Sequence, residues 1–155
     1  MVIKLKPFIT SLAISVGVGV LSAVSTMGSM DVYKEVNKPM LSPPGWLFPI
    51  VWTILFILMG ISSYIVYESK PPYKDISLKI YLLQLAFNFL WSIIFFNAEL
   101  YLFSFIWLIL LWALIVIMIL LFYKVKPIAA YLQIPYLLWV TFAGYLNFMI
   151  YILNK

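Results

Sequence analysis

The chain has 155 residues, 66% of them hydrophobic, a mean hydropathy of +1.11 and a formal net charge of +5. This apolar fraction exceeds what a soluble domain can bury, so the composition indicates an integral membrane protein with a single domain. The chain contains no cysteine and no histidine, which excludes disulfides, zinc sites, thiol nucleophiles and imidazole acid–base chemistry.

The positive charge does not indicate a nucleic-acid interface. Every basic residue is a lysine, and the lysines lie in short gaps between apolar runs. We therefore expect a bilayer, and no nucleic acid, as the surrounding partner.

Five apolar runs are each long enough to cross the hydrocarbon core as a helix, which takes about 20 residues. They lie at about 7–29, 46–67, 77–97, 101–123 and 128–153. Because the runs are continuous and do not alternate in short segments, they exclude a β-barrel. The sequence predicts an all-α integral membrane protein, a five-transmembrane-helix bundle in which residues 1–155 form one domain.

The first run has two interpretations. It could be a signal peptide cleaved near Ser22–Ala23, but its length favours a retained first helix. Small residues recur every four positions along it, namely Ser11, Ser15, Gly19 and Ala23. That spacing lets helices approach closely in lipid, and it fits packing within the chain as well as a homodimer face.

The distribution of lysines predicts the orientation. Seven lie at the amino terminus and in the second and fourth loops, and three lie on the opposite side. The positive-inside rule therefore places the amino terminus inside and the carboxy terminus outside. The same rule places the first loop, about residues 30–45, on the outer side.

This first loop is long for so short a chain, which is typical of a lid or binding loop. It contains Lys38–Pro39 and Pro43–Pro44–Gly45. Prolines preset the backbone and reduce the entropy lost on closing over a ligand. Tyr33 and the three prolines therefore favour an ordered lid over a floppy one.

Three of the predicted helices carry a tryptophan on a face with other notable side chains. These sets are Trp52 with Phe56, Trp91 with Gln84 and Asn88, and Trp139 with Ala143 and Asn147. The amides alone are explained by interhelical hydrogen bonds, each contributing about 1 kcal/mol. Together, beneath a proline-rich lid, the three faces predict an apolar cavity lined with aromatic rings and suited to a large flat ligand.

The remaining features carry less functional weight. The fourth run is the most uniformly apolar, and we expect it to face lipid. All five acidic residues fall in loops or at helix ends. Ion pumps and channels usually need ionisable groups at depth in the membrane, so that class is disfavoured.

Three motifs resemble one known family along essentially the whole chain. The first is Lys38–Pro39 with Pro43–Pro44–Gly45–Trp46 leading into Pro49–Ile50–Val51–Trp52–Thr53 and Met59–Gly60. The second is Gln84, Asn88, Trp91–Ser92 and Phe95–Phe96, and the third is Pro135–Tyr136, Trp139, Ala143 and Leu146–Asn147. The sequence is similar to a bacterial member of the translocator protein family, also called tryptophan-rich sensory proteins or peripheral benzodiazepine receptors. Leu41 departs from the pattern, since members often carry an aromatic residue there.

The resemblance implies a bundle, often a homodimer, that binds porphyrins, isoquinoline carboxamide or benzodiazepine drugs, and sterols or related lipids. Several bacterial members promote light-dependent breakdown of protoporphyrin, and the tryptophans implicated map to Trp52 and Trp139. The implied ligand-binding residues are Tyr33, Pro43, Trp52, Phe56, Gln84, Asn88, Trp91, Trp139, Ala143 and Asn147. A metal-free, non-covalently bound porphyrin is the expected ligand, because no histidine or cysteine can hold iron. The alternative is a carrier or sensor of porphyrins, sterols or other lipids without chemistry. The expected location is a bacterial cell membrane.

Overall fold

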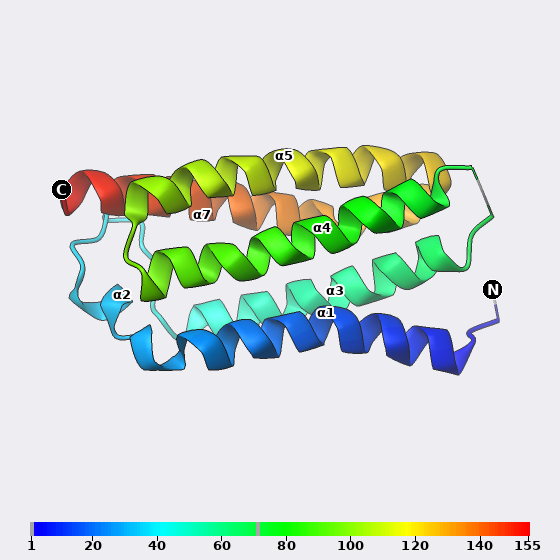
Figure 1. Cartoon of the computed structure of the whole chain (residues 1–155), viewed down its shortest axis with the longest axis horizontal. Coiled ribbons are helices and arrows are strands. Elements are labelled where there is room, and N and C mark those ends of the chain that lie inside the picture. Colours follow the sequence, from blue (N-terminus) through cyan, green and yellow to red (C-terminus); the bar gives the residue numbers. More distant parts are fainter. Residues whose placement is uncertain (1, 71) are drawn as a thin grey trace.

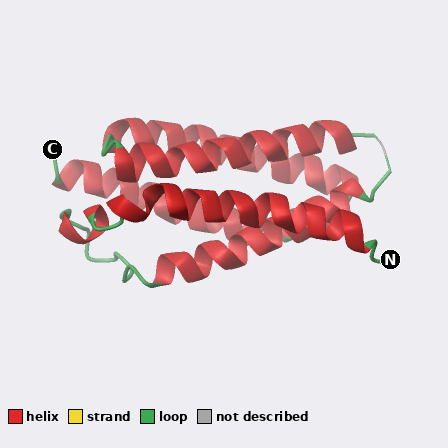
Figure 2. Ribbon diagram, turned by 60° about the horizontal axis from the view of Figure 1, so that its bottom comes forward, coloured by secondary structure: helices red, strands yellow, loops and turns green. Residues whose placement is uncertain are grey.

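The computed structural model describes residues 2–70 and 72–155. These residues form helices and no strands, which confirms the predicted all-α fold class (Figure 2). Within this described part of the chain, five helical segments are long and apolar enough to cross a membrane. The elements are α1 (Leu5–Thr26), the 3₁₀ turn η1 (Met27–Ser29), α2 (Val32–Glu35), α3 (Leu47–Tyr67), α4 (Lys74–Ser92), the π-helical turn η2 (Ile93–Asn97), α5 (Tyr101–Val125), α6 (Pro127–Tyr131) and α7 (Ile134–Leu153).

The last span is interrupted where the sequence predicted one helix at 128–153. Leu132 and Gln133 form a turn between α6 and α7. Pro135 lies in the first turn of α7, where the missing proline N–H has no intrahelical partner to lose. The proline therefore starts a new helix and does not merely kink an existing one.

The two ends of the bundle differ in charge. The amino terminus and the connection from α3 to α4 lie at one end (right in Figure 1), and α2 and the carboxy terminus lie at the other. The lysines counted above are divided in the same way between the two ends. The orientation of these ends across a membrane remains a prediction.

The small residues of α1 pack against α3, beside which it runs in Figure 1. A Cβ atom added to Gly60 would lie 2.7 Å from Ser15 Oγ and 2.9 Å from Leu12 Cα, and one added to Gly19 would lie 2.6 Å from the Phe56 ring. The four-residue spacing thus serves packing within the chain.

Helix α5 has one exposed side and one buried side, so the expectation that it faces lipid was wrong for the buried side. Leu111, Ile115, Met118 and Phe122 of this helix are fully buried, and α5 packs against α4, α6 and α7. The error has a physical cause: a helix that is apolar on every side carries no pattern to distinguish its buried face from its lipid face.

The loop at residues 30–45 is ordered by hydrogen bonds and contains the short helix α2. Lys38 Nζ donates to the carbonyl oxygens of Tyr33 (2.6 Å), Lys34 (3.2 Å) and Val36 (3.4 Å). This ammonium therefore satisfies carbonyls at the end of α2, as cations often do at helix C-termini. The Tyr33 hydroxyl donates to the Pro43 carbonyl oxygen at 3.0 Å, which ties the two ends of the loop together.

A second link fastens this loop to the end of α7. The Asn37 backbone N–H donates to Asn154 Oδ1 at 3.0 Å, and Asn154 Nδ2 donates to the Asn37 carbonyl oxygen at 2.9 Å. We expect Asn154→Ala to speed backbone hydrogen exchange in residues 36–46, because both bonds are lost while α7 remains intact. Hydrogen exchange followed by mass spectrometry measures this, with α5 amides as the internal reference. Unchanged exchange in 36–46 would show that other contacts hold the loop.

Candidate functional site: an aromatic cavity inside the bundle

A cavity lies between α1, α3, α4 and α7 at the end of the bundle that carries α2. Its open space, including the solvent-filled mouth, is about 880 Å³. The lining residues are Gly19, Ser22, Ala23, Thr26, Met30, Tyr33, Phe48, Pro49, Trp52, Phe56, Asn88, Trp91, Ser92, Phe95, Phe96, Ala143, Leu146, Asn147 and Ile150.

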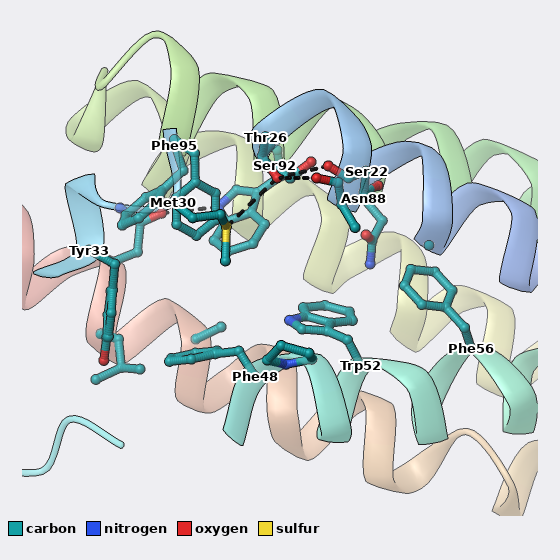
Figure 3. Close-up of a pocket in the computed structure, with 18 of the residues that line it drawn as sticks. Ser22, Thr26, Met30, Tyr33, Phe48, Trp52, Phe56, Asn88, Ser92 and Phe95 are labelled. Atoms are coloured by element: carbon teal, nitrogen blue, oxygen red, sulfur yellow. Dashed lines mark hydrogen bonds between the residues drawn. The ribbon is translucent and has the colours of Figure 1, made fainter. Parts of the chain in front are cut away.

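Helix α3 supplies one wall. Phe48, Trp52 and Phe56 follow one another at four-residue intervals and project from the same side of the helix (Figure 3). The Trp52 and Phe56 ring centroids are 5.7 Å apart, and Phe48 meets the Tyr33 ring edge-on at 5.0 Å. Tyr33 from the lid closes one end of this row, and Phe56 lies at the other.

Helix α4 and the turn that follows it supply the opposite wall. Trp91 stacks on Phe95 with a centroid distance of 5.5 Å, and Phe96 meets Phe95 edge-on at 4.9 Å. Phe95 and Phe96 lie in the π-helical turn η2. A π turn inserts an extra residue and so changes the direction of the side chains that follow. Here it brings two successive phenylalanines to the same cavity.

Asn147 joins three elements beneath this wall. Its Oδ1 accepts hydrogen bonds from Trp91 Nε1 and from Ser104 Oγ, both at 3.1 Å. Its Nδ2 donates to the Tyr101 carbonyl oxygen at 2.8 Å. The side chain is 1% exposed. Asn147 therefore fixes the Trp91 indole against α5 and α7, and its hydrogen-bonding groups are largely used within the protein.

A second buried chain of hydrogen bonds links α4 to α7. Asn88 Nδ2 donates to the Tyr136 hydroxyl at 2.8 Å, and that hydroxyl donates to Gln84 Oε1 at 2.7 Å. Gln84 and Tyr136 are almost fully buried. The interhelical explanation of these amides is therefore supported by the structure, while Asn88 also reaches the cavity lining.

The structure brings seven of the ten expected site residues to the cavity and leaves three outside its lining. The seven are Tyr33, Trp52, Phe56, Asn88, Trp91, Ala143 and Asn147. Pro43 contributes its carbonyl oxygen to Tyr33 from the loop. Gln84 lies one turn deeper than Asn88, behind Tyr136.

Trp139 is the largest departure from the expected site. It lines a separate shallow groove between α3 and α7, together with Val51 and Phe142, and its ring meets Phe48 edge-on at 5.7 Å. Phe48 therefore separates Trp139 from the cavity. The four-residue spacing places Trp139 and Ala143 on neighbouring turns of α7. It cannot show how α7 is rotated against α3, and that rotation decides that Ala143 lines the cavity while Trp139 lies outside it.

Sequence reasoning missed several lining residues, of which Phe48, Phe95 and Phe96 are the largest. Phe48 is four residues before Trp52, so the spacing used for Trp52 and Phe56 could have found it. Phe95 and Phe96 depend on the π turn, for which the sequence has no clear signal.

The cavity offers few polar groups to a ligand. No Asp, Glu or Lys is among its lining residues in the described parts of the chain. Ser22 Oγ is buried and has no hydrogen-bond partner among the described residues. Burial raises the pKa of the Tyr33 phenol above its usual range, which keeps it neutral. The lining is thus mostly aromatic and aliphatic, and it is uncharged among the described residues.

Fold and site together define a class: a membrane protein of five spanning helices that encloses an aromatic cavity under an ordered loop. Comparison with known sequences identifies the family. The TspO/MBR family pattern matches residues 11–153, and the chain belongs to that family.

Named relatives come from distant organisms. The chain is 42% identical over 124 residues to "Tryptophan-rich protein TspO" of Chlorobaculum tepidum, covering 79% of this chain and 78% of that protein. It is 41% identical over 123 residues to the protein of the same name in Archaeoglobus fulgidus, covering 79% of each. It is 33% identical over 122 residues to "Translocator protein" of Homo sapiens, covering 77% of this chain and 72% of that protein.

Proposed function

We propose that this protein binds a metal-free porphyrin of the protoporphyrin type in the aromatic cavity and promotes its light-dependent oxidative breakdown. The observation that supports the proposal is the pair of aromatic walls that line the cavity, with Phe48 and Trp52 on α3 and with Trp91 and Phe95 on α4 and η2. Figure 3 shows Phe95 across the cavity from Phe48 and Trp52. Aromatic rings stack on or edge a planar macrocycle and contribute about 0.5–1.5 kcal/mol per pair beyond area burial. Isoquinoline carboxamide and benzodiazepine drugs, which are also flat and apolar, are expected to compete for the same space.

In the proposed reaction dioxygen is the oxidant. The illuminated macrocycle loses electrons, dioxygen gains them, and the ring opens by taking up oxygen. Trp52 lines the cavity, so its indole would pass an electron from the macrocycle to dioxygen and then return to its starting state. Trp139 would act through the Phe48 ring, which lies between Trp139 and the cavity.

Illumination of the purified protein with protoporphyrin tests this function. We expect porphyrin absorbance to fall in the light and to stay constant in the dark. Trp52→Phe and Trp139→Phe should retain binding, measured by quenching of the remaining tryptophans, but lose breakdown, with the larger loss at Trp52. Trp112→Phe is the matched control, because Trp112 is 41% exposed on the outside of α5. If each variant loses binding and breakdown equally, the indoles serve only as walls.

A carrier or sensor without chemistry is the second candidate. It is favoured by the absence of charged side chains from the cavity lining in the described residues. Stoichiometric binding with no light-dependent product would select this function, with porphyrins, sterols or other lipids as the ligands. In either case we propose a bacterial cell membrane as the location, the amino terminus inside and a homodimer as the assembled form.

A further inference from the structure

The segment that leads from the lid into α3 runs along the side of the bundle. It starts level with the end of α7, because Asn37 is hydrogen-bonded to Asn154. It ends level with the second turn of α7, because the Phe48 ring meets the Trp139 ring at 5.7 Å. The length of helix between Trp139 and Asn154 is roughly 20 Å at 1.5 Å per residue. Figure 1 shows the resulting step, since α3 begins well to the right of the carboxy terminus.

This segment contains a turn whose two central side chains are apolar and exposed. The Ser42 N–H donates to the Pro39 carbonyl oxygen at 3.1 Å, so Met40 and Leu41 occupy the middle of the turn. Met40 is 99% exposed and Leu41 is 69% exposed. Turns in water are dominated by Gly, Pro, Asn, Asp and Ser. Two bare hydrophobic side chains at the centre of a turn therefore indicate a surrounding other than water.

Trp46 connects this turn to the exposed side of α3. Trp46 is 67% exposed, and Ile50 and Ile54 follow it at four-residue intervals with 51% and 53% exposed. On a membrane-spanning helix, a row of exposed apolar side chains contacts lipid. The sequence has no charged residue between Lys38 and Glu68. The lipid-facing surface of α3 thus continues into the turn without an intervening charge.

The charged residues of the lid lie on the other side of the turn, toward the end of the bundle. Asp31, Lys34 and Glu35 belong to α2 and its first turn, and α2 lies at the end of the bundle in Figure 1. Lys34 pairs with Asp31 at 2.7 Å. Charged side chains remain in water, whereas tryptophan is enriched where water meets lipid. The turn and Trp46 therefore lie on the membrane side of the charged part of the lid.

We propose that Met40, Leu41 and Trp46 form a membrane contact of the lid, inserted among the lipids of the leaflet on the α2 side. The three side chains occupy the zone between the head groups and the first part of the acyl chains. The lid is then held at two places, by Asn154 at the end of α7 and by the bilayer. This contact does not depend on what the aromatic cavity binds.

Cysteine accessibility tests the proposal, because the chain has no cysteine of its own. Met40→Cys and Leu41→Cys are made singly in the full chain and placed in lipid nanodiscs, which leave both ends of the bundle open to water. Mass spectrometry follows the reaction with a charged, water-soluble maleimide. We expect both thiols to react about tenfold more slowly than Glu35→Cys, because apolar surroundings suppress the reactive thiolate.

The controls bracket the two environments. Glu35 is exposed on α2, so its cysteine variant reports water, and Ile54→Cys on the exposed side of α3 reports lipid. Once the protein is unfolded in denaturant, all four thiols should react at the same rate. A bimane fluorophore at Leu41→Cys should also be quenched by phosphatidylcholine that carries a nitroxide near the top of one acyl chain. The same fluorophore at Glu35→Cys should be quenched less than half as much.

Two results would overturn the proposal. Reaction of Met40→Cys and Leu41→Cys as fast as that of Glu35→Cys would place the turn in water. Slow reaction without quenching by the nitroxide lipid would show that a second copy of the chain, and not lipid, covers the turn. Neither measurement involves a porphyrin, so failure of this contact and failure of the cavity function are distinguishable.

Discussion

Replacing Asn147 by leucine is expected to destabilise the protein by about 2–4 kcal/mol. The estimate follows from three interhelical hydrogen bonds at 2.8–3.1 Å, each contributing about 0.6–1.7 kcal/mol in a membrane protein. Leucine has nearly the same volume, so the loss comes from the three bonds themselves and from the Trp91 N–H, which is left buried without a partner. The Ser104 hydroxyl still donates to the Tyr101 carbonyl oxygen at 2.9 Å. Thermal unfolding in detergent and reversible denaturation measure the change.

The same substitution should also weaken porphyrin binding, because Trp91 loses the bond that holds its indole at the cavity wall. Asn97→Leu is the matched control: its side chain makes a single hydrogen bond, to the Ser25 carbonyl oxygen at 2.9 Å, in an exposed position. We expect less than half the effect of Asn147→Leu there. Equal effects at the two sites would show that the Asn147 network contributes little.

Gly60→Leu is expected to be the most disruptive single substitution in the contact between α1 and α3. Its Cβ would lie 2.9 Å from the backbone at Leu12, and backbone cannot rotate away as a side chain can. The two helices would have to separate, and overpacking of this kind costs about 1–3 kcal/mol or more. A lowered unfolding temperature and faster hydrogen exchange along both helices should report it.

Gly17→Leu provides the control on the same helix. Nothing lies within 4 Å of a Cβ at Gly17, so we expect the stability of the single chain to change by less than about 0.5 kcal/mol. Size-exclusion chromatography with light scattering adds a second readout. Loss of a homodimer in Gly17→Leu, with the chain still folded, would assign this side of α1 to the partner copy. Destabilisation as large as that of Gly60→Leu would contradict the packing described here.

The parts of this fold that follow from chain chemistry were predictable. Runs of about 20 apolar residues define spans, and lysines define their ends, because the cost of burying backbone and charge in lipid admits few alternatives. Four-residue spacing also placed Trp52 and Phe56 on one wall. These predictions depend only on the 3.6-residue period of a helix and on the cost of placing polar groups in lipid.

What could not be predicted depends on which sides of the helices meet. Trp139 lies behind Phe48, and α5 buries one side despite its uniform apolarity. Both outcomes are determined by how the helices are rotated about their axes. Phe95 and Phe96 reach the cavity through a π turn, a local departure from regular geometry whose cause lies in tertiary packing.

The uncharged lining of the cavity has a consequence for how a dicarboxylic guest must sit. Burying a carboxylate without a cation beside it is very costly, so under the proposed function the porphyrin would enter with its two propionates trailing. Those acids would then remain in water near the lid, where Lys34 and Lys38 are found. In the proposed complex one end of the ligand therefore stays in contact with water while the macrocycle is enclosed by the aromatic rings.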